Sequence, residues 1–234
     1  MKFKIDSQIF NKFSNLNIGI LVCRNIYNKG ISEDVIELIR EREKEIKSQL
    51  DLETLSRNPK INVWREAYRS FGAKPKENKS SVESLYRRTL EGGEIKHINK
   101  IVDIYNYISL KYMLPVGGED LDKIQGDIHL TVAGKNEPFV LLLGDKEARP
   151  PHEGEVIYRD KISAICRRFN WREADRTKFT EETRNAILVE EGLFPTQKED
   201  IENVLEEMKK LLVNFCGGDI SKFILNKNNS EIEF

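Results

Sequence analysis

One short stretch of the chain carries the residues best suited to ester chemistry. Gly117 and Gly118 could expose backbone N–H groups to an ester oxygen, and such donors stabilise the oxyanion that forms when an ester is attacked. Glu119 or Asp120, which follow directly, could orient a water molecule or bind an amino group. A tight turn that needs glycine, with Asp120 capping the next element of the chain, explains the same run. Asn106, further upstream, could bind a ligand or satisfy backbone groups at a helix end.

Other catalytic chemistries lack a recognisable motif. The chain has no paired-cysteine motif, no His-Glu-x-x-His and no glycine-rich phosphate loop, and its Gly117-Gly118 pair lacks the third glycine of a dinucleotide fingerprint. The three histidines are far apart in the sequence, so they are not expected to form a metal or catalytic cluster. Cys166 follows apolar residues and is expected in the core rather than as a nucleophile. We therefore expect no metal and no cofactor.

Residues 57–88 carry a local excess of positive charge, with nine Lys or Arg against three Glu. Such a segment could bind phosphate groups, and a loop at residues 72–79 would present its lysines to a ribose-phosphate chain. A solvated lysine-rich surface explains the run equally well. On the first interpretation, the candidates for RNA binding in this segment are Arg65, Arg69, Lys74, Lys76 and Lys79.

The composition is that of a globular protein of 234 residues, with 39% hydrophobic residues, 33% charged residues and a net charge of −1. No apolar run is long enough to cross a bilayer, so no membrane partner is expected. The first residues lack a hydrophobic signal region and the three cysteines are widely spaced, which favours a cytoplasmic location. The length favours one domain over residues 1–234, with its core at about 18–212.

The elements that position these residues follow from hydrophobic periodicity. Apolar residues recur at helical spacing after Ser32, and capping boxes begin helices at Ser80 with Glu83 and at Thr196 with Glu199. The middle of the chain alternates in the period of a strand. Helices are expected at residues 32–50, 63–70 and 98–110, from residue 80 through Tyr86, and from residue 196 to near Gly217. The expected strands cover 18–23, 128–132, 139–143, 155–158, 162–166, 186–189 and 223–225, and residues 226–234 are expected to fray. Helices before and after a block of strands indicate a single α+β domain.

Two segments carry a family resemblance. Residues 99–126 contain Asn-x-x-Val-Asp-x-x-Asn-Tyr, then Pro115, then Asp-Leu-Asp-Lys before Gly126. This pattern strongly resembles the editing-domain signature of the phenylalanyl-tRNA synthetase beta subunit. Residues 154–194 look like the branch of that family in which the domain occurs without the synthetase's other parts, and the resemblance spans about residues 18–212. It implies a mixed, mostly antiparallel sheet flanked by helices, with an amino-acid pocket beside a channel for the tRNA end.

The resemblance also implies roles for single residues. The asparagine before Tyr in the family signature lies in the editing pocket, and it corresponds to Asn106 here. Where the family commonly has a histidine shortly after the proline, this chain has Gly117, so a role for that histidine is lost and specificity for the phenylalanine system is in doubt. Because an aminoacyl ester is already labile, the site needs mainly to hold it, admit a water molecule and stabilise the oxyanion.

The second segment supplies residues for the amino acid and for the RNA. Glu173 and Glu190 are expected to line the pocket, where acidic groups favour a polar or cationic side chain over phenylalanine or tyrosine. Arginines could bind phosphates of the tRNA end while Phe169 or Trp171 stacks on its terminal adenine. If the segment is a strand, aromatic and basic residues alternate between its faces, and burial of the aromatics is then the ordinary explanation. The RNA-binding candidates here are Arg167, Arg168, Trp171 and Arg172.

The expected function is hydrolysis of the ester of a misacylated tRNA in trans, without synthetase activity. The alternative is a tRNA- or RNA-binding module that kept the editing fold and lost hydrolysis, consistent with Gly117 at the histidine position. A third possibility is a protein that binds a free amino acid or another small molecule. The expected partner is the aminoacylated end of tRNA, not DNA or a membrane, and no oligomeric state is predicted.

Overall fold

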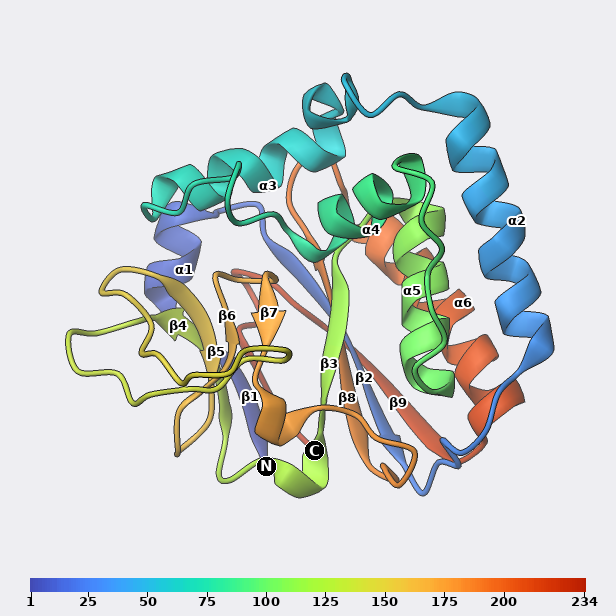
Figure 1. The fold of residues 1–234 in the computed structure, drawn as a ribbon. Coiled ribbons are helices and arrows are strands. Elements are labelled where there is room, and N and C mark those ends of the chain that lie inside the picture. The colour runs from blue at the N-terminus through green and yellow to red at the C-terminus, as the bar shows by residue number, and fades with distance from the viewer.

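The computed structural model describes residues 1–234 and contains two β-sheets with helices packed around them (Figure 1). One sheet has the strand order β10-β1-β4-β5-β6-β7 and the other has the order β3-β8-β2-β9. A cluster of 53 buried hydrophobic residues draws on both sheets and on the helices. The predicted α+β class is therefore confirmed.

The six-stranded sheet is built around the N-terminal strand. β1 (Lys2–Ile5) pairs in parallel with β4 (Ile128–Val132) and antiparallel with β10 (Glu231–Glu233). The antiparallel strands β5 (Val156–Arg159), β6 (Ala164–Arg167) and β7 (Arg172–Glu173) continue the sheet from β4. The short strand β7, which carries Glu173, therefore lies at one edge of this sheet.

The four-stranded sheet is entirely antiparallel. β2 (Asn17–Arg24) lies at its centre between β8 (Ala186–Gly192) and β9 (Asp219–Leu225), and β3 (Val116–Asp120) pairs with the other side of β8. β2 is the apolar run at 17–24 and is almost wholly buried, as expected of a central strand. β3 forms an edge of this sheet.

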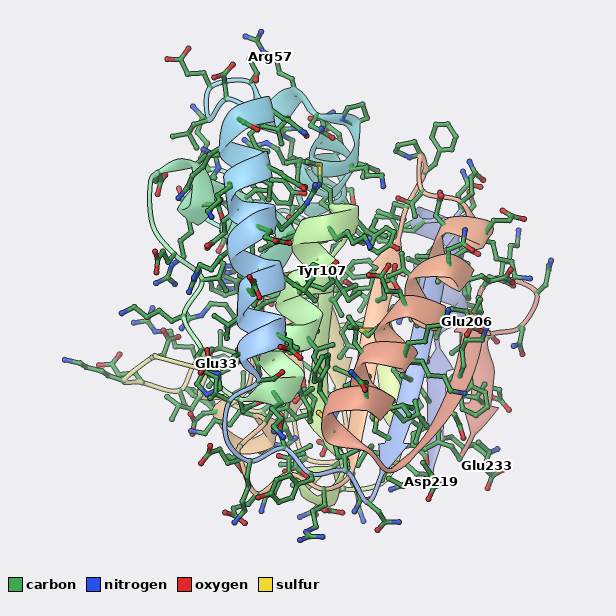
Figure 2. All side chains as sticks on the ribbon, turned by 90° about the vertical axis from the view of Figure 1, so that its right-hand side faces the viewer. Glu33, Arg57, Tyr107, Glu206, Asp219 and Glu233 are labelled. Carbon is green, nitrogen blue, oxygen red and sulfur yellow. The ribbon has the colours of Figure 1, made fainter.

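Helices cover one face of the four-stranded sheet. α2 (Glu33–Gln49), α5 (Lys100–Tyr112) and α6 (Lys198–Cys216) lie side by side in Figure 2, with α6 in front of β2 and β9. α3 (Pro59–Ser70) and α4 (Ser81–Leu90) lie toward the top of Figure 1, and α1 (Ser7–Lys12) follows β1. Short 3-10 helices cover Leu55–Arg57, Leu121–Lys123 and Asp175–Thr177. No helix combines the length and the apolar character that a membrane span requires.

Most expected elements are present, with bounds shifted by a few residues, but four expectations were wrong. Residues 139–143 form no strand and make only isolated bridges at Val140 and Leu142. Residues 117–120 belong to strand β3 instead of a turn. Residues 226–234 do not fray, because β10 pairs with β1. The capping box of α6 uses Gln197 and Asp200, one residue later than expected.

Candidate functional site

A cavity of about 500 Å³ lies between the two sheets. Residues from β3 and β8 form one wall, residues from β5, β6 and β7 form the facing wall, and residues from α4 and α5 complete the lining. The walls are mostly apolar, with a small number of polar groups among them. This combination is typical of a site for a small molecule or for one group of a larger ligand.

Three glutamates from three strands line the cavity: Glu119, Glu173 and Glu191. Glu119 pairs with Ile187 in the register between β3 and β8, and Glu191 lies four residues beyond Ile187 on the same strand. Alternate residues of a strand share a face, so Glu119 and Glu191 lie on the same face of the four-stranded sheet. Glu173 comes from β7 of the facing sheet.

Hydrogen bonds within the protein occupy both carboxyl oxygens of Glu191. The Tyr158 hydroxyl donates to one oxygen at 2.6 Å and the Asn170 amide donates to the other at 2.8 Å. Tyr68 in turn donates to the Asn170 carbonyl oxygen at 2.9 Å. Burial nevertheless raises the pKa of Glu191 to about 7. This network joins the two sheets and α3. Both carboxyl oxygens of Glu191 therefore have a hydrogen-bond partner within the chain.

Glu173 and Glu119 are much less satisfied. The Gly118 N–H donates to Glu173 Oε1 at 3.2 Å, and burial raises the pKa of Glu173 to about 7. Glu119 is only 5% exposed, and its Oε2 is buried without a hydrogen-bond partner. Burial raises the pKa of Glu119 well above its usual value, and the nearby Glu173 carboxylate raises it further. These two carboxyl groups remain available to a ligand.

Glycine at position 117 makes room for Glu173. A Cβ atom at Gly117 would lie 2.7 Å from Glu173 Oε1, closer than such atoms approach each other. The interpretation of residues 117–120 as a glycine turn is therefore wrong, because the absent side chain accommodates a carboxyl group from the facing sheet. The edge position of β3 leaves the Gly118 N–H available to that carboxyl.

Asn106 lies in the middle of α5 and lines the cavity. It is 7% exposed, and its carboxamide makes no hydrogen bond within the chain. The alternative that it satisfies backbone groups at a helix end is therefore wrong. An unoccupied carboxamide on a cavity wall can donate to or accept from a bound polar group.

Two residues predicted for the site lie outside it. Asp120 accepts from the Asp122 backbone N–H at 3.0 Å and from the Thr183 hydroxyl at 2.7 Å, so it has the capping role given as its alternative. Glu190 points to the opposite face of β8 from the cavity, and both its oxygens are buried without partners. Burial raises its pKa well above the usual value. The prediction that Glu190 lines the pocket is wrong, since strand alternation places Glu191 there instead.

Trp171, Arg172 and Arg88 line the cavity, and Arg168 contacts Trp171. The guanidinium carbon of Arg168 lies 4.2 Å from the centre of the Trp171 ring and that of Arg172 lies 5.3 Å from it, distances typical of cation–π contact. Arg172 also donates to Asp145 at 2.8 Å and to the Leu143 carbonyl. Arg88 lines the cavity from α4 and is exposed, without an ion pair or a side-chain hydrogen bond.

The turn that carries Trp171 was not foreseen. Arg168 and Phe169 both have positive φ, at 50° and 67°, so residues 167–172 reverse direction between β6 and β7 and do not form a continuous strand. The expected alternation of faces is therefore wrong. Phe169 is fully buried against Trp64 and Phe13 in edge-to-face contacts, which removes it as a base-stacking residue.

The other predicted RNA-binding residues are mostly engaged within the protein. Arg167 is buried and forms a two-pronged ion pair with Glu155 at 2.8 Å for each contact, so the prediction that it reaches a phosphate is wrong. Arg65 and Arg87 share Glu83, which is fully buried. Most of the remaining predicted cations have local partners: Arg69 pairs with Glu66, Lys74 pairs with Glu77, Lys79 donates to the Lys76 carbonyl, and Arg168 donates to Asn78. The Lys76 side chain is exposed and makes no ion pair, so it stays a candidate for RNA binding.

Sequence reasoning missed Glu191 and Arg88. Two adjacent acidic residues in an apolar strand indicate that one of the two side chains points into the protein. Which of the two does so depends on the strand register, and the register is a property of the tertiary structure. Arg88 was counted within the basic segment without being singled out. The feature that could have identified Arg88 is its position on the exposed face of an amphipathic helix. The neighbouring residues Ser84 and Leu85 of this helix also line the cavity.

A protein-family model described as the B3/4 domain matches residues 63–217. The phenylalanine–tRNA ligase beta subunit of Fusobacterium nucleatum subsp. nucleatum is 28% identical over 152 residues, covering 56% of this chain and 19% of that subunit. The beta subunit from Photorhabdus laumondii subsp. laumondii is 25% identical over 181 residues, covering 66% and 22%. This chain thus spans about a fifth of the length of these relatives.

Among solved structures, an N-terminal fragment of the phenylalanyl-tRNA synthetase beta subunit from Pyrococcus horikoshii is similar with a TM-score of 0.43 and 14% sequence identity. The similarity covers 96% of this chain and 54% of that chain.

Proposed function

Because the chain belongs to the B3/4 domain family, we propose that it is an aminoacyl-tRNA deacylase that hydrolyses the ester of a misacylated tRNA in trans. The observation that carries this proposal is the cavity between the sheets, whose lining includes Asn106, Glu119 and Glu173 together with an exposed arginine and a tryptophan. An amino acid fits such a cavity, and a nucleotide fits the cationic and aromatic rim.

In the proposed reaction, the terminal adenosine stacks on Trp171 and the neighbouring phosphate binds Arg88, while the aminoacyl group enters the cavity. A pKa of about 7 allows Glu173 to accept a proton from water near neutral pH. The water oxygen attacks the ester carbon, and the oxyanion is stabilised by Asn106 and by the Gly118 N–H as Glu173 turns to the water. The bond to the ribose oxygen then breaks, and that oxygen takes the proton from Glu173. The products are a free amino acid and tRNA.

The test is release of amino acid from a panel of correctly and wrongly charged tRNAs. Wild type is compared with Asn106→Ala and Glu173→Gln, and Glu190→Gln serves as the matched control because it removes a buried carboxyl group that does not line the cavity. We expect selective release by wild type and by the control, and a loss of about 10²-fold or more with Glu173→Gln. Thermal melting of each variant separates loss of chemistry from loss of folding.

A non-catalytic RNA-binding module is the second candidate. It is favoured by one feature of the cavity: Glu173 occupies the Gly118 N–H that would otherwise face an ester oxygen. Such a module would bind tRNA with strong salt dependence and leave every ester in the panel intact. Binding without release above the buffer rate would therefore replace the deacylase proposal with this one.

A further inference from the structure

The three carboxyl groups of the cavity differ in how many hydrogen-bond donors the chain gives them. Glu191 has internal donors for both oxygens, and Glu173 has one backbone donor. Glu119 has no backbone, amide or charged donor, only the Thr177 hydroxyl beside it, although its side chain lines the cavity. A buried carboxyl group with so few donors costs free energy, so a donor on a bound ligand would stabilise Glu119.

No cation of the chain forms an ion pair with Glu119, although the nearby Arg176 lowers the pKa of its carboxyl group. Of the arginines near the cavity, Arg172 is bound to Asp145 and to the Leu143 carbonyl. Arg176 is bound to Asp160 at 2.6 Å. Arg88 is exposed at the rim on α4. Two neighbouring carboxyl groups in an apolar cavity cannot both ionise without a positive charge nearby, which is why Glu173 raises the pKa of Glu119.

The wall beside Glu119 suits a flexible aliphatic stem. Ile187 and Val189 lie on the same face of the sheet as Glu119 and line the cavity, as does Tyr105 from α5. Lysine-like side chains bury their methylene groups on apolar surface while the charged head seeks a polar partner. A hydroxyl group would also donate to Glu119, but it would leave the two carboxyl groups sharing one negative charge.

We infer that the cavity selects aminoacyl groups with a cationic side chain, whose ammonium or guanidinium group binds Glu119 while the stem lies along Ile187 and Val189. This inference rests on the proposed function, because it names the substrate class of that same site. Glu119 is then the residue that determines specificity, and Glu173 is the residue that accepts the proton of the attacking water at the ester.

The experiment compares matched ligands with and without the charge. Hydrolysis is measured with one tRNA carrying lysine, norleucine or serine, for wild type, Glu119→Gln and the control Glu190→Gln. In parallel, calorimetry measures the binding of lysinamide and norleucinamide, which does not depend on turnover. We expect lysine to be preferred over norleucine by at least about tenfold in both measurements, the ratio of a charge-assisted hydrogen bond. In Glu119→Gln the ratio falls toward one, and in Glu190→Gln it stays.

The outcomes separate the two claims. Hydrolysis of norleucine or serine esters as fast as lysine esters would overturn the selectivity while leaving the deacylase. Preference for lysinamide in binding, with no ester cleaved, would support the selectivity and count against the deacylase. Equal affinity for the two amides, or binding of neither, would overturn the inference. A lysine preference that persists in Glu119→Gln would overturn the assignment of the selectivity to Glu119.

Discussion

Glu190 and Glu191 are neighbours on β8, yet their carboxyl groups lie on opposite faces of the strand. Glu191 accepts two hydrogen bonds on the cavity side, whereas Glu190 has no partner on the helix side. Both are among the most buried acids of the molecule. Their shared residue type therefore says less about their roles than the side of the sheet on which each lies.

The buried carboxyl group of Glu191 predicts a pH dependence of stability. Its pKa is raised from 4.5 to about 7 in the folded protein, so between these values the folded state holds a proton that the unfolded state has lost. Stability therefore falls as pH rises from about 4.5 to about 7, by up to about 1.4 kcal/mol per pH unit, and levels off above. Glu191→Gln removes this contribution, so the variant gains on wild type as the pH increases.

Urea unfolding midpoints at pH 5, 6, 7 and 8 check this prediction. The unfolding midpoint of Glu191→Gln minus that of wild type should increase with pH. Glu153→Gln, on the exposed surface, should follow wild type at every pH. Glu173 stays in the variant and keeps part of the slope. Parallel curves for the variant and wild type would show that Glu191 does not hold an extra proton in the folded state.

Arg88 predicts a specific loss of RNA binding. It lines the cavity from an exposed position without an ion pair, whereas Arg69 is paired with Glu66 and lies outside the cavity lining. Arg88→Ala should weaken tRNA binding several-fold and reduce the slope of log K against log salt by about 0.7, the value for one phosphate contact on a single strand. Arg69→Ala should change both less. Filter binding at several salt concentrations measures them, and equal effects of the two variants would contradict the assignment of Arg88 to the rim.

At the scale of elements, α6 packs closely against the four-stranded sheet at glycine residues, which have no side chain to separate helix and sheet. A Cβ at Gly19 of β2 would lie 2.8 Å from Ile201 Cγ2 and 2.9 Å from Leu205 Cδ1. Gly192 at the end of β8 makes a similar approach to Ile201. The closeness of helix and sheet therefore depends on these positions, because a protein interior is already close-packed.

Gly19→Ala should destabilise the fold by about 1–3 kcal/mol, the usual cost of adding a methyl group to a filled core. Gly134→Ala is the control, since its Cβ would meet nothing closer than Glu137 Oε1 at 3.9 Å. Chemical denaturation gives the free energy of unfolding for both variants. An unchanged value for Gly19→Ala would mean that α6 can move away from β2 at little cost.

At the scale of the whole molecule, the two ends of the chain close the six-stranded sheet. β1 lies between β4 and β10, and the N–H of Ile5 donates to the Ser230 carbonyl at 2.8 Å. Both ends lie close together at the bottom of Figure 1. Without β10, β1 would become an exposed edge strand, and exposed edges promote association.

Deletion of residues 226–234 should therefore lower the melting temperature by a few degrees, corresponding to about 1 kcal/mol or more, and increase concentration-dependent association. Glu233→Gln keeps the strand and should behave as wild type. Calorimetry and light scattering at several concentrations check both effects. A deletion variant that melts as wild type does would show that β10 adds no stability to the sheet.

The sequence by itself determined the class of the fold and much of the cavity wall. Periodic apolar positions are local properties, so the helix at 33–49 and the strands at 17–24 and 186–192 could be predicted from their own residues. The family resemblance carried by residues 99–126 singled out Asn106, and the chemistry of their residue types singled out Gly117, Gly118 and Glu119; all four line the cavity.

The tertiary structure decided which charged groups are free. Arg167 is unavailable because it binds Glu155, which lies just before the neighbouring strand β5, and Glu191 replaces Glu190 because of the register of β8 against β3. Glu173 reaches Gly118 only because two separate sheets face each other. The partners of a charged group come from segments distant in the chain, so its availability depends on long-range packing that no local pattern encodes.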